Sequence, residues 1–402
     1  MERKEQELRL HIALGGPLMA IKGFAAKEVE QANARAREIC LLLDATPQLF
    51  QVLWGQWAFY FFVGTKLQTS REVAEQLLSL SENLQDRDLR LEANYALGSN
   101  LFHVARFADA VAKFDAGLSY YDRSSHHSQV AIYSYDKGVA CLGIAAQSLW
   151  YLGFSDRGLN YVREGLRMAH NLSHPFSLAL AMNFSGWLYV LRQEVTEALE
   201  QAQALIMLST EHEFPAFVAL GKIIWGWAVS QRGNLEVGLT SIREGAEAWV
   251  ATGSQVARLN HLTLLAEVCQ KLQRFEEGLT WLSEGLEIVN RTGESFLEAE
   301  IYRLKGELLK QQINAKKVKN IEEDSEVERC FIRAIEVARS QGAKSLELRS
   351  VMSLCRLWAA QGKIEQSRQM LAEIYAWFTE GLDTVDLQEA QTLLKELSQK
   401  IA

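Results

Sequence analysis

The sequence predicts an all-α fold: a right-handed α-α superhelix, or tetratricopeptide-like solenoid, of about nine helix pairs with a roughly 40-residue period and a C-terminal capping helix. The first observation is a repeat. The segment GNLEVGLTSIREG, residues 233–245, is followed forty residues later by QRFEEGLTWLSEG, residues 273–285. The second is composition, because 48% of the 402 residues are apolar, which is ample for a continuous core.

The second helix of each unit is recognised by one recurring position that comes soon after a short turn. Four copies of this position, from Gly158 to Gly278, are spaced by forty residues. Apolar or small residues follow each copy at helical spacing, which predicts a helix with one buried face. The position is occupied by Ala110, Gly158, Ala198, Gly238, Gly278, Val327 and Ser367.

The first helix of each unit is apolar and begins at proline in three copies, at Pro47, Pro175 and Pro215. Proline is tolerated at a helix start because the first N–H groups have no partner within the helix. Short turns such as Gly153-Phe154 and Gly233-Asn234 then separate the first helix from the second. The predicted unit is therefore helix, short turn, helix.

The repeats divide one continuous solenoid into four parts. Divergent repeats are predicted at 1–85, regular repeats at 86–312, a charged loop insertion at 313–325, and C-terminal repeats with a capping helix from Asp386 at 326–402.

The net charge, the apolar runs and the cysteine spacing indicate which partners are unfavourable and in which compartment the protein is expected. The net charge of −8 disfavours nucleic acid and anionic membranes. The longest apolar run, residues 49–64, contains two glutamines and is too short to span a bilayer. Five cysteines lie far apart without a C-x-x-C pair, and the first ten residues do not form a signal peptide. We expect a cytoplasmic protein with buried thiols and no membrane contact.

The sequence contains no convincing catalytic, cofactor or metal motif. A phosphate-binding loop needs G-x-x-x-x-G-K-[ST], whereas Lys222 and Lys363 follow single glycines and precede isoleucine. His170 and His174 have a spacing that suits zinc, but Pro175 marks that point as a helix boundary and favours a structural role. We therefore expect no enzyme activity, no cofactor and no metal.

In a tetratricopeptide stack the first helix of each pair lines the concave surface, and positions shortly before the turn share one register. Trp150, Trp187 and Trp227 fall in or near that register, whereas Trp225, Trp249, Trp281 and Trp377 fall beside core positions. The groove is predicted to pass from aromatic to basic, which suits a peptide with an apolar anchor and acidic residues. Its residues are Phe102, His103, Gln147, Trp150, Tyr151, Asn183, Trp187, Trp227, Asn260, Lys271, Arg303, Arg349 and Arg356.

Three segments carry a resemblance to a known family: IYRLKGELL at 301–309, GAKSLELRSVMSLCRLWAAQGK at 342–363 and IYAWFTEGLDTVDLQEAQTLLKEL at 374–397. They resemble the C-terminal tetratricopeptide region of bacterial signalling proteins that join a class III adenylate or guanylate cyclase, or a kinase, to a STAND-type "predicted ATPase". The resemblance implies a regulatory arm in signal transduction, whose partner is such an ATPase or cyclase. This chain lacks those domains, so we expect a free-standing arm, a fragment, or a partner supplied in trans.

Two functions are consistent with these observations. The first is a non-catalytic protein-protein interaction and sensor module that binds a peptide or protein in its concave groove. The alternative is the regulatory arm of a cyclase or ATPase whose catalytic domains lie on a missing segment or a separate chain.

Overall fold

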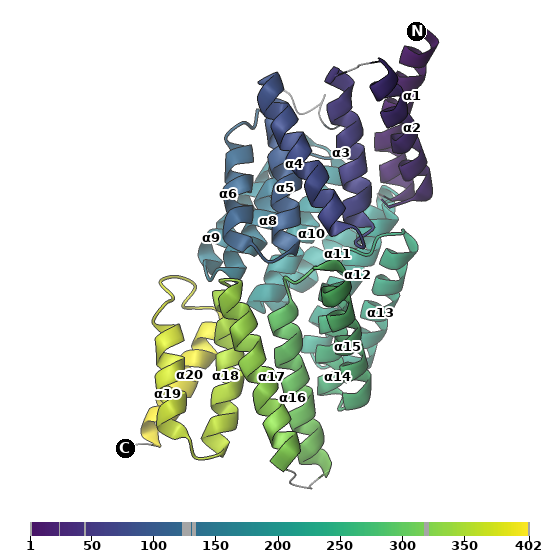
Figure 1. Ribbon diagram of the computed structural model, residues 1–402. Helices are drawn as coiled ribbons and strands as arrows, with labels where there is room; N and C mark the ends of the chain where they lie inside the picture. Colours follow the sequence, from purple (N-terminus) through teal and green to yellow (C-terminus); the bar gives the residue numbers. More distant parts are fainter. Residues whose placement is uncertain are drawn as a thin grey trace.

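The computed structural model describes residues 2–23, 25–43, 46–122, 130, 134–316 and 321–400. These residues form 19 helices, arranged as nine antiparallel pairs and a final helix that together wind into a right-handed superhelix (Figure 1). The predicted all-α solenoid and its capping helix are confirmed. Within the described ranges, no helix is long and apolar enough to cross a bilayer.

The nine pairs follow one another along the chain, and the segment between α6 and α8 lies partly outside the described residues. Their bounds are α1 (Glu2–Lys22) with α2 (Lys27–Leu43), α3 (Thr46–Phe62) with α4 (Leu67–Leu84), α5 (Arg87–His103) with α6 (Phe107–Leu118), α8 (Lys137–Tyr151) with α9 (Ser155–Leu172), α10 (Pro175–Arg192) with α11 (Val195–Glu211), α12 (Pro215–Gln231) with α13 (Leu235–Ala251), α14 (Arg258–Lys271) with α15 (Phe275–Thr292), α16 (Glu298–Lys316) with α17 (Ile321–Ser340), and α18 (Lys344–Ala360) with α19 (Ile364–Tyr375), followed by α20 (Val385–Gln399).

The two helices of a pair differ in how they are buried. Every residue of α8 is buried, whereas in α9 the buried residues are confined to one stripe that includes Gly158, Val162, Gly165 and Ala169. A helix that is apolar all round belongs inside, and a helix with one apolar stripe belongs at the surface. First helices therefore form the inner layer of the superhelix and second helices the outer layer.

The recurring small residue allows the two helices of a pair to approach closely. A Cβ atom placed on Gly158 would lie 2.7 Å from the carbonyl oxygen of Ala146, and one on Gly238 would lie 2.5 Å from that of Gly226. Distances this short do not occur for real side chains, so an alanine at either position would push the helices apart. This is the physical basis of the forty-residue repeat.

The predicted loop at 313–325 is mostly helical, which corrects the sequence interpretation. Helix α16 extends to Lys316 and α17 begins at Ile321, and residues 317–320 lie outside the described residues. Lysine and glutamate are good helix formers, so a run of charges describes the outer face of a helix as readily as a loop. The sequence also exceeds the forty-residue period around residues 121–138, and most of that segment lies outside the described residues.

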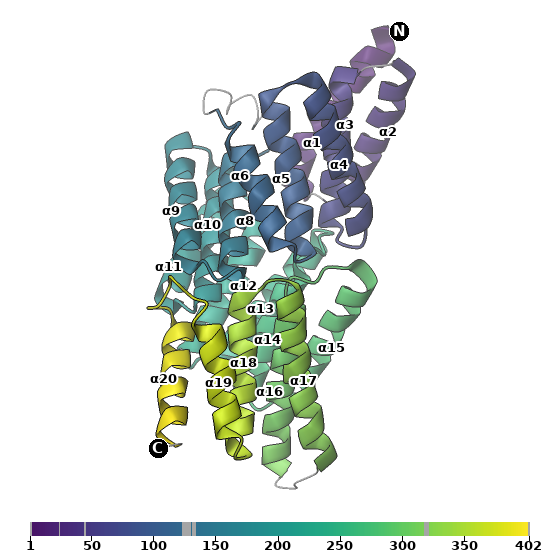
Figure 2. The same ribbon diagram turned by 60° about the vertical axis from the view of Figure 1, so that its left-hand side comes forward.

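The second half of the superhelix lies directly below the first half, so that α16–α20 sit beneath α3–α9 (Figures 1 and 2). Three hydrogen bonds join the halves in the same way: Gln255 N–H donates to Phe62 O at 2.9 Å, Ser295 N–H to His103 O at 2.8 Å, and Ser345 Oγ–H to Trp150 O at 2.5 Å. The acceptors are carbonyls at the C-terminal ends of α3, α5 and α8, where helices leave carbonyls unpaired, although the Trp150 carbonyl also accepts from Gly153 N–H. The superhelix is therefore closed on itself, one turn against the next.

Glu294 is the most buried charged group at this closure, with 1% of its surface exposed. Its Oε1 accepts a hydrogen bond from the Ala257 N–H at 2.7 Å and lies 2.8 Å from His103 Nδ1. One carboxylate thus ties the end of α5 to the linkers that precede α14 and α16.

We predict that Glu294→Ala lowers the free energy of unfolding by about 2–4 kcal/mol, because it leaves two buried polar groups without a partner. Glu294→Gln keeps an acceptor oxygen and should lose less. Thermal and urea denaturation followed by circular dichroism measures both. Equal stability of Glu294→Ala and the parental protein would contradict the role of this carboxylate in the closure.

Candidate functional site

The interior of the superhelix contains two neighbouring cavities, which are the candidate site. The first, here called the apolar chamber, has a volume of about 160 Å³, and the second, the charged chamber, has a volume of about 280 Å³. Trp187 on α10 and Asn260 on α14 line both, so the chambers adjoin each other along the inner helices. The concave interior that contains both chambers is called the channel below.

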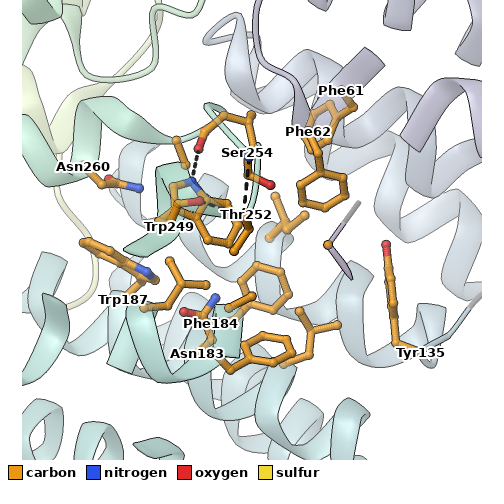
Figure 3. Close-up of a pocket in the computed structure, with 18 of the residues that line it drawn as sticks. Phe61, Phe62, Tyr135, Asn183, Phe184, Trp187, Trp249, Thr252, Ser254 and Asn260 are labelled. Atoms are coloured by element: carbon orange, nitrogen blue, oxygen red, sulfur yellow. Dashed lines mark hydrogen bonds between the residues drawn. The ribbon is translucent and has the colours of Figure 1, made fainter. Parts of the chain in front are cut away.

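The apolar chamber is enclosed mainly by first helices, from α3 to α14. Its wall includes Phe61 and Phe62 at the end of α3, Phe184 on α10, and Trp249 at the end of α13 (Figure 3). Trp249 is fixed because its Nε1–H donates to Val256 O at 3.1 Å. Among the described residues, no Asp, Glu, Lys or Arg side chain lines this chamber.

Two polar side chains in the apolar chamber are buried without partners. The amide oxygen of Asn183 makes no hydrogen bond within the described part of the chain, and neither ring nitrogen of His261 does. Asn183 is 7% exposed and His261 is 2% exposed. Burial, with a smaller contribution from the positive charge of Arg258, lowers the pKa of His261 to about 3. The imidazole is therefore neutral at physiological pH.

The charged chamber contains four cations and four carboxylates, and each cation is paired. The nitrogen-to-oxygen distances are 3.5 Å for Lys271 and Glu267, 2.6 Å for Arg303 and Glu300, and 2.9 Å both for Arg349 and Asp386 and for Arg356 and Glu389. The predicted basic end of the groove is thus balanced in charge. The position within the repeat identified the four cations from sequence, but it did not identify their acidic partners. Two of these partners lie one turn away on the same helix, and two lie on α20.

The structure brings most of the predicted groove residues into the channel. The apolar chamber is lined by Phe102, His103, Gln147, Asn183, Trp187 and Asn260. The charged chamber is lined by Trp187, Trp227, Asn260, Lys271, Arg303, Arg349 and Arg356. A role for these residues in binding a partner stays a prediction.

Trp150 and Tyr151 do not line either chamber, although the sequence placed them on the groove. Tyr151 stacks on Phe107 with ring centroids 4.5 Å apart, and the Arg349 guanidinium lies 4.8 Å from the centre of the Trp150 ring. Both side chains are buried, because the next superhelical turn covers the end of α8. Repeat register alone does not reveal that contact.

The residues of the apolar chamber that sequence reasoning missed include His261 and Trp249. Trp249 was assigned to the core because it falls beside core-pattern positions, and the structure places it both in the core and against the chamber. His261 follows a predicted groove residue directly, but no sequence signal distinguishes it. The histidine that was weighed as a zinc ligand, His174, instead caps α10 by accepting a hydrogen bond from Ser177 N–H at 3.2 Å.

The geometry defines a class of protein, a tetratricopeptide-like helical-repeat solenoid with an internal channel. No protein-family model matches the chain, and no curated protein sequence matches it. Among solved structures the chain is similar to a Rap protein complexed with Competence and Sporulation Factor, at 12% identity and a TM-score of 0.61, over 98% of this chain and 99% of that one.

Two further solved structures are similar at lower TM-scores. The Rap conjugation gene regulator of the plasmid pLS20, in complex with the Phr* peptide, has 11% identity and a TM-score of 0.50 over 87% of this chain and 96% of that one. A STAND protein with a tetratricopeptide repeat sensor from Pyrococcus horikoshii has 12% identity and a TM-score of 0.41 over 94% of this chain and 55% of that one. At these identities, the likeness to the two Rap structures is one of fold.

We predict that Trp150→Ala lowers the free energy of unfolding by about 3–5 kcal/mol, since it empties a packed site beneath the second turn. Trp377, which is 38% exposed, provides a control, and Trp377→Ala should lose clearly less. Urea denaturation of both variants tests the assignment. A Trp150→Ala variant as stable as the parental chain would show that this ring is not part of the core.

Proposed function

We propose that the chain is a non-catalytic interaction and regulatory module that binds a peptide, or a segment of a partner protein, along its internal channel. The observation that carries this proposal is that the two chambers adjoin each other and share Trp187 and Asn260 in their walls. A channel of this kind suits an extended ligand with an apolar group at one end and polar groups at the other.

The comparisons add support from proteins of the same fold. The Rap protein at a TM-score of 0.61 is described in complex with Competence and Sporulation Factor, and the pLS20 regulator at 0.50 in complex with the Phr* peptide. A shared superhelix offers a similar concave interior to a ligand. We infer that regulation of a partner by a bound peptide is a function suited to this chain.

The charge balance of the second chamber changes the ligand expected from sequence. Four cations opposite four carboxylates give no net attraction for an acidic peptide, and any ligand group placed there competes with an existing ion pair. We therefore propose that affinity comes from the apolar chamber and that the charged chamber selects polar groups by position.

The regulatory arm of a cyclase or STAND ATPase is the second candidate, and the sequence resemblance favours it. In that case the channel, or the outer surface, contacts the ATPase in cis or in trans. A cytoplasmic location and the exclusion of nucleic acid and membrane as partners remain part of the proposal. Adding the purified chain to ATPase domains of that family and measuring their turnover tests this candidate, and unchanged turnover with no complex would count against it.

A display selection of random peptides on the purified chain tests the first candidate. We predict that the selected peptides bind about tenfold or more weakly to Asn260→Trp, because a large ring at the junction blocks passage between the chambers. Met207→Trp is the matched control, because Met207 is 71% exposed on the outer helix α11. Calorimetry measures both affinities, and peptides that bind both variants equally would place the binding surface outside the channel.

A further inference from the structure

The apolar chamber contains unused hydrogen-bonding capacity at two buried side chains. A buried polar atom without a partner destabilises a folded protein, and native structures retain few of them. Here the Asn183 amide oxygen and both His261 ring nitrogens are in that state, in the same chamber. Their presence in a wall where no described Asp, Glu, Lys or Arg side chain can pair with them indicates a ligand that supplies the missing partners.

The two side chains flank one indole. Asn183 and Trp187 lie one turn apart on α10 and face the chamber together (Figure 3). The Trp187 ring stacks on His261, with ring centroids 6.4 Å apart, and the Trp249 ring meets His261 edge-on at 6.5 Å. A ligand that rests against Trp187 therefore lies next to both polar groups.

The chemistry of these groups specifies what they can bind. The Asn183 oxygen is an acceptor, and a neutral imidazole offers one N–H donor and one acceptor nitrogen. An amide group matches this set because it has an N–H and a carbonyl oxygen. A carboxylate or an ammonium group would be desolvated without a counter-charge, since no Asp, Glu, Lys or Arg of the described ranges lines the chamber.

The size of the chamber specifies the rest of the ligand. A cavity of about 150 Å³ lined by apolar side chains holds one benzene molecule. The apolar chamber has a volume of about 160 Å³ and a wall that includes Phe184, Trp187 and Trp249. One aromatic ring fits it, with offset or edge-on contacts to these rings.

We propose that the apolar chamber binds an aromatic ring joined to an uncharged amide, whose N–H donates to Asn183 Oδ1 and whose carbonyl accepts from His261. On the proposed function, on which this identification of the ligand rests, that group is an internal aromatic residue of the bound peptide. The residue is internal because a free terminus would bring a charge into the chamber.

The probe for the experiment is N-acetyl-4-fluorophenylalaninamide, which is neutral and carries an aromatic ring and amides. Fluorine NMR titration of the purified chain measures its affinity. Two comparison compounds are N-acetyl-4-fluorophenylalanine, which carries a carboxylate, and 4-fluorotoluene, which has no amide. The amide probe should bind about tenfold or more tightly than either compound.

Two variants remove the unpartnered atoms while keeping similar volume, Asn183→Leu and His261→Phe. Each should weaken the amide probe by about tenfold and should also raise the melting temperature of the free chain, since a buried polar atom without a partner is lost. A polar group with a purely structural role would lower the melting temperature instead. The matched control is Asn94→Leu, because Asn94 is equally buried on α5 but its Nδ2–H donates to Arg90 O at 2.8 Å. This control should not raise the melting temperature and should leave the amide probe bound as before.

Three results would overturn the inference: no binding of the amide probe, equal binding of a comparison compound, or unchanged affinity in both variants. Failure of this inference can be distinguished from failure of the proposed function. A chain that binds its display-selected peptides through the channel but gives one of these results keeps the function and loses the amide-specific chamber. A chain that binds the amide probe with the expected variants but captures no peptide keeps the chamber and loses the function.

Discussion

The contact between successive turns of the superhelix is the constraint on which the rest of the structure depends. Residues 192 to 195 positions apart meet at Phe62 and Gln255, at His103 and Ser295, and at Trp150 and Ser345. In an open solenoid the carbonyls of Phe62 and His103 would face water, and that of Trp150 would keep only its local bond from Gly153 N–H. Here they are acceptors for the next turn, so each inner helix is fixed at its end as well as along its side. An open groove with one solvated face thereby becomes a channel.

Closure also explains the unusual polarity of the interior. Because the second turn covers the first, side chains that an open repeat would expose must pair or remain unsatisfied. Arg349 illustrates the first outcome: it lies over the Trp150 ring, pairs with Asp386 and donates to Leu191 O at 2.7 Å. The Asn183 amide oxygen and the His261 ring nitrogens instead remain unsatisfied, in a chamber that no described Asp, Glu, Lys or Arg side chain lines. A buried polar group without a partner lowers the stability of the fold, and such departures are expected at functional sites.

The local part of this fold was predictable from sequence, and the long-range part was not. Gly158 and Gly238 occupy the same position of the forty-residue unit, two units apart, because two backbones must approach there, and that constraint acts within one unit. The same logic placed Trp187, Trp227 and Arg303 on the inner wall. It misplaced Trp150 and Tyr151, because their cover comes from α18, almost two hundred residues further along the chain. It also treated the segment from Ile313 to Ser325 as a loop, since charge was taken as a sign of irregular structure, whereas α16 extends to Lys316 and α17 begins at Ile321.

The arrangement of charge decides which chamber can discriminate between ligands. In the charged chamber, burial raises the pKa of Asp386 while the charge and hydrogen bonds of Arg349 oppose that shift, so the carboxylate depends on its existing partner. A ligand that takes either member of such a pair must leave the other buried and unpaired, and it gains little overall. In the apolar chamber no bond has to be broken before a ligand bonds to Asn183 or His261, so each new hydrogen bond contributes fully. We therefore expect ligand specificity to come from the apolar chamber, through a few hydrogen bonds between uncharged groups, and not from the ion pairs of the charged chamber.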